Sequence, residues 1–184
     1  MKHFAFRIGS IIALALSLTI PANAEEPEAA DPWAPVRVLL CEWQGVGVGF
    51  GGESLVRHTY EFVIQGHFIQ STTVSKFQPK KDGTPAEIHE DWGFLSYDSD
   101  RGKIVFRQFL SEGFVNTYLL EDPAPGSEDL IFTSEHTEGA GGMAARLTFS
   151  FDGIDAFRLV LDLASPGKDF FACQTLDMKR RFGD

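Results

Sequence analysis

His58 and Tyr60 form one of two groups of residues whose types and spacing could do chemistry. With Phe62 they occupy alternate positions of a run that reads as a half-buried strand, so their side chains point to the same apolar face. A lone inward histidine is most often a hydrogen-bonded core residue. His58 is nevertheless the best candidate in this sequence for a polar group that orients a bound molecule, with Tyr60 as its neighbour.

Glu87, His89 and Asp91 form the second group. Their spacing puts the three side chains on one face of a predicted strand, with Glu90 on the other. Two carboxylates flanking an imidazole could prepare it as a general base or help it to hold zinc. A zinc site needs three ligands around one point, which one strand rarely supplies. The spacing therefore favours an exposed polar face beside a turn at 79–83, and no metal site is predicted.

Other patterns of catalytic chemistry are absent from the sequence. It has no Gly-x-Ser-x-Gly nucleophile elbow, no Gly-rich phosphate loop, no His-Glu-x-x-His and no paired Cys-x-x-Cys. We therefore assign no catalytic residue, and the sequence favours a binding protein over an enzyme. An acid–base enzyme that uses His58 or the cluster of Glu87, His89 and Asp91 is the alternative.

Length, composition and charge narrow the class of protein and of partner. The 184 residues are 43% hydrophobic and 12% aromatic, which is enough for a packed core and excludes a disordered chain. The formal net charge is −10 at pH 7, and the only basic run is Lys179-Arg180-Arg181. A surface of that sign repels polyanions, so we expect neither nucleic acid nor an anionic membrane surface as a partner.

The N-terminal segment reads as a secretory signal. Lys2 and Arg7 form a positively charged end before an apolar stretch at 8–20, and Ala22-Asn23-Ala24 supplies small residues for cleavage. The apolar stretch is shorter than the ~20 residues of a membrane-spanning helix. We therefore expect a periplasmic or secreted protein without a membrane span. The predicted organisation is a signal peptide at 1–24, a flexible acidic leader at 25–35 and one β-barrel domain at 36–184.

Cys41 and Cys173 are the two cysteines of the chain, and an oxidising compartment favours their pairing. They lie near the first and last predicted strands, which are neighbours if the sheet closes on itself. We expect a disulfide that joins the two ends of the sheet and stabilises the fold by about 3–5 kcal/mol. Two buried, unpaired thiols are the alternative.

Short strands separated by turn signals fill the rest of the chain, with no convincing amphipathic helix between them. Such regular spacing favours an antiparallel meander, and closing it into a barrel removes the exposed edges of the sheet. A flattened sandwich is the structural alternative. The expected strands are 43–50, 56–64, 67–77, 87–97, 103–110, 114–120, 130–137, 143–151, 154–163 and 169–180.

The stretch Trp43-Gln44-Gly45-Val46-Gly47-Val48-Gly49-Phe50 resembles the first strand of nitrobindin-like barrels, which are relatives of the lipocalin and fatty-acid-binding calycins. The segments at 90–98 and 109–113 resemble the middle hairpins of the same superfamily and of related barrels of unknown function. The resemblance implies a closed barrel of calycin type.

Alternate glycines at Gly45, Gly47 and Gly49 would leave one face of this first strand bare. A bare face permits sharp coiling, or close approach of the backbone to the core or to a ligand. The resemblance also suggests that Trp43 plugs the barrel floor beneath the glycines.

The nitrobindin-like resemblance further implies a haem-ligating histidine on a late strand. The last expected strand contains Phe170-Phe171-Ala172-Cys173-Gln174-Thr175-Leu176-Asp177-Met178, which has no histidine. It also lacks the Arg-x-Tyr with which fatty-acid-binding relatives hold a carboxylate. By strict alternation Gln174 and Leu176 face one side and Cys173 the other. We therefore expect no haem and no other cofactor.

Together these observations predict an all-β protein, a closed antiparallel up-and-down barrel of about ten strands. Its expected function is to hold a small apolar or amphipathic molecule in the interior without transforming it. A filled barrel that acts as an envelope interaction module is a further alternative. The residues expected to face the ligand are Val56, His58, Tyr60, Phe62, Phe106, Gln108, Phe114, Asn116, Tyr118, Leu147, Phe149 and Gln174.

Overall fold

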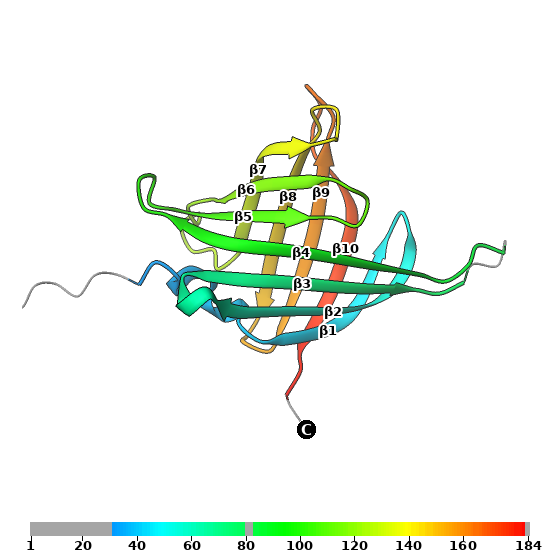
Figure 1. Cartoon of the computed structure of the whole chain (residues 1–184), viewed down its shortest axis with the longest axis horizontal. Coiled ribbons are helices and arrows are strands. Elements are labelled where there is room, and N and C mark those ends of the chain that lie inside the picture. Colours follow the sequence, from blue (N-terminus) through cyan, green and yellow to red (C-terminus); the bar gives the residue numbers. More distant parts are fainter. Residues whose placement is uncertain (1–30, 80–82, 183–184) are drawn as a thin grey trace, which may run out of the picture. The chain divides into compact units, whose positions relative to one another are not determined.

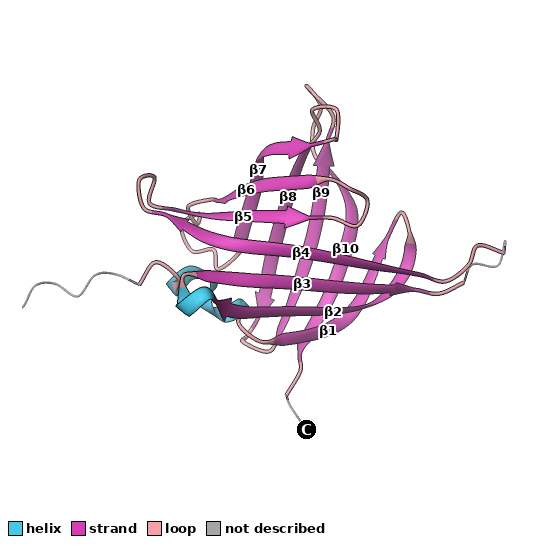
Figure 2. Ribbon diagram, viewed as in Figure 1, coloured by secondary structure: helices cyan, strands magenta, loops and turns pink. Residues whose placement is uncertain are grey.

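The computed structural model describes residues 31–79 and 83–182. Within these residues the chain forms ten strands and two short 3-10 helices, which confirms the all-β fold class (Figure 2). The helices are η1 (Ala34–Leu39) and η2 (Ile64–Gly66). The strands are β1 (Glu42–Gly49), β2 (Gly52–Val63), β3 (Phe68–Phe77), β4 (Glu87–Asp98), β5 (Lys103–Phe109), β6 (Val115–Leu120), β7 (Leu130–Glu138), β8 (Ala144–Asp152), β9 (Ala156–Ala164) and β10 (Phe171–Arg180).

Three expectations fall on positions without a structural description. The signal peptide at 1–24 and the leader residues 25–30 lie outside the described residues, as do residues 80–82 of the turn predicted at 79–83. In the described part of the chain, no helix is long and apolar enough to cross a bilayer.

The strands follow one another around a single closed sheet (Figure 1). Each pairs antiparallel with its neighbours in the sequence, and β1 pairs with β10 to complete the barrel. The register of this seam runs from Trp43 opposite Arg180 to Gly49 opposite Gln174. Because the sheet closes, each strand has a hydrogen-bonded neighbour on both sides. The predicted up-and-down barrel is therefore confirmed, and the flattened sandwich is wrong.

Alternation of side chains explains why these segments form strands. In β2, Ser54, Val56 and His58 are buried while Leu55 and Arg57 between them are exposed. A strand directs successive side chains to opposite faces, so one face of β2 joins the barrel interior and the other meets solvent.

One end of the barrel is closed by η1 and by Trp43. Trp43 is fully buried, and its indole Nε1 donates a hydrogen bond to the Leu39 carbonyl oxygen at 2.8 Å. Trp33 is buried as well and packs edge-on against Phe62, with ring centroids 5.8 Å apart. Residues 33–35, which the sequence assigns to a flexible leader, are therefore part of the folded barrel. A single tryptophan between prolines has no periodicity that could predict this.

A continuous set of aromatic rings fills the barrel from the closed end to its middle. Neighbouring ring centroids lie between 4.6 Å and 6.0 Å apart, in tilted and edge-to-face arrangements except for the stacked pair of Phe106 and Tyr118. This half of the interior is therefore solid. In order from the closed end, the rings belong to Trp43, Phe157, Phe149, Phe132, Phe106 and Tyr118.

The glycine-rich face of β1 is covered by core side chains of the neighbouring strands. A Cβ on Gly47 would lie 2.6 Å from Leu176 Cδ2 and 2.8 Å from Ser54 Oγ, both closer than carbon atoms tolerate. A Cβ on Gly45 would collide with the carbonyl oxygen of Asp177. Glycine at these two positions therefore lets β10 and β2 pack closely over β1.

Cys41 and Cys173 are both free, so the expected disulfide is wrong. Antiparallel pairing sets Gly49, at the end of β1, opposite Gln174, near the start of β10. Cys41 precedes β1 and lies eight residues before Gly49, which at ~3.3 Å per residue puts it about 26 Å from the Cys173 end of the seam. A disulfide needs Cα atoms within ~4.4–6.8 Å of each other. The two thiols lie at opposite ends of the barrel.

Candidate ligand-binding site

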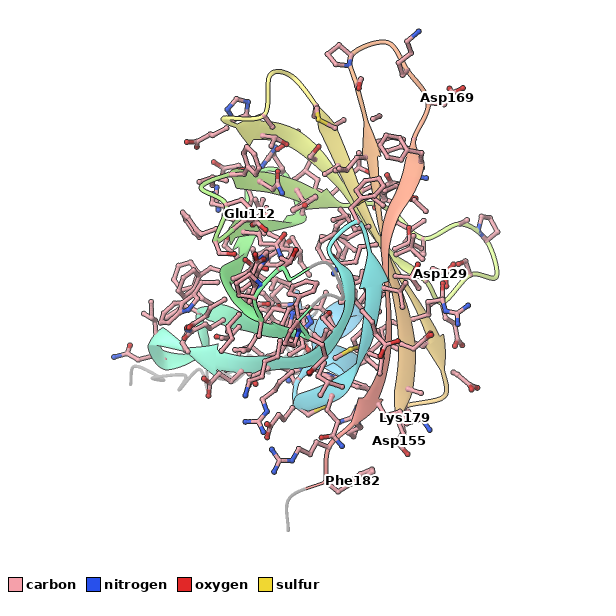
Figure 3. All side chains as sticks on the ribbon, turned by 90° about the vertical axis from the view of Figure 1, so that its right-hand side faces the viewer. Glu112, Asp129, Asp155, Asp169, Lys179 and Phe182 are labelled. Atoms are coloured by element: carbon pink, nitrogen blue, oxygen red, sulfur yellow. The ribbon has the colours of Figure 1, made fainter. Side chains whose placement is uncertain are left out.

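The barrel interior holds a cavity of about 610 Å³ at the end away from Trp43. Its rim is formed by the β1–β2, β5–β6 and β7–β8 connections. In Figure 3 the rim residue Glu112 is labelled on the β5–β6 connection, and Asp155 marks the β8–β9 turn at the closed end. The volume lies within the ~300–1,000 Å³ of most small-molecule sites.

The cavity wall has an apolar side and a polar side on opposite arcs of the barrel. Strands β8, β9 and β10 form the apolar arc, with the side chains of Ala145, Leu147, Leu159, Leu161, Leu163 and Leu176. Strands β2 to β6 form the polar arc, with His58, Thr73, Ser75, His89, Asp91, Gln108, Asn116 and Tyr118. Such a wall suits a ligand that is itself apolar on one side and polar on the other.

His58 lies deep on the polar arc and is only 4% exposed. Its Nε2 is 3.1 Å from the Ser71 hydroxyl, while its buried Nδ1 has no hydrogen-bond partner among the described residues. The imidazole lies against the Tyr60 ring, with ring centroids 4.4 Å apart. Burial lowers the pKa of His58 to about 3, so the ring is neutral at pH 7. Burial also raises the pKa of Tyr60, which keeps its phenol protonated.

Asn116, Tyr118 and Gln108 form a chain of hydrogen bonds beside His58. The Asn116 side-chain amide donates to the Tyr118 hydroxyl at 2.9 Å, and that hydroxyl donates to Gln108 Oε1 at 3.4 Å. Because a phenol has one proton and Gln108 accepts it, the Asn116 carbonyl oxygen stays free as an acceptor. This buried oxygen has no partner in the described part of the chain. Burial raises the pKa of Tyr118, which keeps the donor of this chain protonated.

His89 lies at the rim between two carboxylates. Its Nε2 is 3.3 Å from Glu87 Oε2, and its Nδ1 is 3.0 Å from Glu112 Oε1. Glu87 belongs to the predicted cluster, whereas Glu112 comes from the β5–β6 connection and carries no sequence signal that could have indicated it. Across residues 31–79 and 83–182, no group of three or more potential ligands could hold a metal ion.

Asp91 takes its hydrogen bonds from Ser111 and not from His89. Its Oδ1 accepts hydrogen bonds from the Ser111 backbone N–H at 3.0 Å and from the Ser111 hydroxyl at 3.3 Å. Burial raises the pKa of Asp91 above its usual range. His89 and Asp91 both line the cavity, so the prediction of an exposed polar face is wrong for them. They share the inward face of β4 with the buried Leu95.

Seven of the twelve residues expected to face a ligand line this cavity. They are His58, Gln108, Phe114, Asn116, Tyr118, Leu147 and Gln174. The other five pack in the core or at the closed end instead, namely Val56, Tyr60, Phe62, Phe106 and Phe149. Alternation predicts which face of a strand points inward, but it does not predict how far along the strand the interior is filled.

Cys173 lines the cavity next to Gln174, although strict alternation predicts opposite faces. The register between β9 and β10 shifts between Ala172 and Gln174, which is a β-bulge. A bulge inserts one extra residue into a strand and breaks its alternation. The expectation that Cys173 faces away from Gln174 is therefore wrong.

Comparisons with known proteins reveal the fold only. No family model matches the chain, and no curated protein matches its sequence. Rv2717c from M. tuberculosis has a similar structure, with a TM-score of 0.62 and 16% identity over 84% of this chain and 100% of that chain. A protein of unknown function from the DUF3598 family of Nostoc punctiforme PCC 73102 covers 82% of this chain and 99% of its own, with a TM-score of 0.27 and 9% identity. The likeness to Rv2717c is one of fold alone, and this chain's own fold is the closed ten-strand barrel.

Proposed function

We propose that this protein is an exported carrier that holds a small amphipathic molecule in its barrel without transforming it. The observation that supports the proposal is the cavity of about 610 Å³ with an apolar arc facing a polar arc. The leucines of β8–β10 would bury the apolar body of a ligand, and His58 and Asn116 would meet its polar group. We also propose nitrobindin-like membership, on the motif of the first strand at 43–50.

Buried polar atoms without partners add to this support. The Nδ1 of His58, the Oδ1 of Asn116 and the Oγ1 of Thr137 belong to cavity-lining residues and lack partners among the described residues. Each such atom costs about 1–3 kcal/mol when it stays unpaired. A ligand that supplies hydrogen bonds and also fills the apolar arc would offset this cost. A filled barrel, the interaction module of the sequence alternatives, would have no such wall.

The cavity lining does not suit haem, and we propose no cofactor. Where the resemblance implies a late-strand histidine, β10 presents Cys173, Gln174 and Leu176 to the cavity. Asp91 and Glu112 at the rim would face the propionates of a haem with charge of the same sign.

Export is proposed from the sequence, on the signal at 1–24. The test is N-terminal sequencing of the protein purified from its own host. We expect the chain to begin at Glu25. A chain that keeps Lys2 and Arg7 would contradict export by this signal.

Nile red, a neutral dye without hydrogen-bond donors, tests the binding proposal. The expected result is a saturable rise in its fluorescence with one dye per chain. Leu147→Trp would fill part of the cavity, because Leu147 is 5% exposed and lines it. We expect this variant to weaken dye binding at least tenfold, or by about 1.4 kcal/mol.

Thr148→Trp is the matched control for this experiment, since Thr148 is the next residue of β8 and lies on its outer face. It should bind Nile red as the wild type does. Absence of dye binding by the wild type, or equal binding by Leu147→Trp with an unchanged melting temperature, would refute the proposal.

Acid–base catalysis is a second candidate function, and the position of His89 favours it. Its two ring nitrogens lie within 3.3 Å of Glu87 and Glu112 at the cavity rim, where a substrate would enter. Hydrolysis of p-nitrophenyl esters by the wild type, lost in His89→Gln, would support this candidate. Equal rates for both proteins would leave no role for His89 as an acid or base in that reaction.

A further inference from the structure

The charges on the cavity wall are of one sign. Asp91 and Glu112 line the cavity, and Glu87 lies beside His89 at the same rim. No lysine or arginine lines the cavity in the ranges 31–79 and 83–182. Three carboxylates thus stand against a single rim imidazole, His89, because the deeper imidazole of His58 is neutral.

Below this rim the interior holds an unpartnered atom that can only accept a hydrogen bond. Asn116 is 5% exposed, lines the cavity and has a carbonyl oxygen without a partner in the described chain. Its amide Nδ2 donates one hydrogen bond to the Tyr118 hydroxyl, whose own proton is directed to Gln108. A ligand group placed at this oxygen must therefore donate a hydrogen bond.

From these two observations, and building on the proposed carrier function, we infer that the ligand is a cationic, hydrogen-bond-donating amphiphile, of which a primary amine with an apolar tail is the simplest example. Its ammonium group would lie among Asp91, Glu112 and the Asn116 carbonyl oxygen, and its tail would lie against the leucines of β8–β10. A carboxylate ligand would meet the same rim without a counter-charge, because no basic side chain of the described lining faces it. Coulomb attraction across a partly desolvated rim exceeds that in bulk water.

Competition against bound Nile red tests the inference with three twelve-carbon ligands: dodecylamine, dodecanol and dodecanoate. At pH 8 the amine is protonated and the dodecanoate is ionised. At 0.15 M salt and below the micelle concentration, we expect the amine to displace the dye at a concentration at least tenfold lower than dodecanoate does. Dodecanol, a neutral donor, should fall between them.

Substitutions at the rim test whether Asp91 and Glu112 cause the preference for the amine over dodecanoate. The double variant Asp91→Asn and Glu112→Gln should reduce the preference for amine over dodecanoate to less than about threefold. Glu112→Gln alone, at an exposed position of the β5–β6 connection, should reduce it partly and keeps the test valid if the double variant fails to fold. Glu90→Gln is the matched control, since Glu90 lies between His89 and Asp91 in β4 but on its exposed outer face.

Three results of these experiments would overturn the inference. Equal displacement by amine and dodecanoate, or stronger displacement by dodecanoate, would overturn the inference while dye binding keeps the carrier function. If the rim variants keep the preference for the amine, the preference arises from the overall charge of −10 and not from the rim carboxylates. That result would overturn the inference as well. Failure of the wild type to bind Nile red would remove the carrier function and the inference together.

Discussion

His58 is a polar side chain on which the stability of the barrel and the chemistry of the cavity both depend. It is neutral because it is buried, and it keeps Nδ1 available because Ser71 occupies only Nε2. A neutral imidazole can orient a ligand through a hydrogen bond, but it contributes no positive charge that would attract a carboxylate. Its burial also makes folding depend on pH, because the unfolded chain exposes the ring to protons.

The stability of the protein should therefore fall in acid through His58. The pKa of the ring is about 3 in the folded state and ~6.5 in the unfolded chain, so below pH 6.5 the unfolded chain binds a proton that the folded chain does not. This stabilisation is complete above pH 6.5 and is lost as the pH falls from 6.5 towards 3, by about 1.4 kcal/mol per pH unit.

Urea unfolding of wild type and His58→Gln at pH 7, 6, 5 and 4 measures this effect. The difference in unfolding free energy between the two proteins should shrink or reverse as the pH falls, because glutamine does not titrate. A difference that stays constant across these values would contradict a buried neutral His58.

Polar residues inside the barrel were the hardest to place from the sequence. Alternation correctly puts Asn116 and Gln108 on inward faces, because apolar neighbours share those faces. His89 and Asp91 alternate with equal regularity but sit among other polar residues, and hydropathy then favours the wrong, exposed side. Their inward direction follows only from the closed barrel, in which the face of β4 that holds the buried Leu95 lines the interior from end to end.

At the scale of elements, β1 is built differently from the other strands. Beyond the buried Trp43 its inner face is glycine, and Val46 and Val48 are exposed on its outer face. The absent side chains of Gly45 and Gly47 leave space that Leu176 and Met178 of β10 occupy. Beyond Trp43 the strand therefore contributes close packing at the seam in place of inward side chains of its own.

Gly47→Ala should destabilise the barrel. The new Cβ would lie 2.6 Å from Leu176 Cδ2 and 2.8 Å from Ser54 Oγ, so at least one buried neighbour must shift. Overpacking of this kind costs about 1–3 kcal/mol. Val48→Ala, one residue along on the exposed face, is the control and should cost less than about 1 kcal/mol. Chemical denaturation of both variants measures the difference, and equal stabilities would mean that the seam does not pack as described.

Strand positions were predictable because turn residues and alternation mark them locally. The elements that escaped prediction depend on distant contacts. The packing of Trp33 requires Phe62, and the bulge at Cys173 appears only in the pairing of β10 with β9. The depth of the cavity is of the same kind, since it depends on where the aromatic rings between Trp43 and Tyr118 stop filling the interior.

At the scale of the whole molecule, the direction of the two strands at the seam decides where the cysteines lie. Antiparallel pairing of β1 with β10 brings the start of one strand to the end of the other. Cys41 lies just before the start of β1 and Cys173 lies near the start of β10. The antiparallel seam therefore places them at opposite ends of the barrel. In an antiparallel pair the two strand starts lie at opposite ends. Closeness of both cysteines to the seam therefore does not predict a disulfide.

Both thiols should accordingly stay free even in an oxidising compartment. Iodoacetamide added to the denatured protein without reductant should attach to two cysteines, and the single variants Cys41→Ala and Cys173→Ala should each gain one adduct. Native thiols should react slowly, because burial raises the pKa of both and the thiolate is the reactive form. The melting temperature should be the same with and without dithiothreitol. Adducts that appear only after reduction, with a lowered melting temperature, would require a seam register other than Gly49 opposite Gln174 and would change which residues line the cavity.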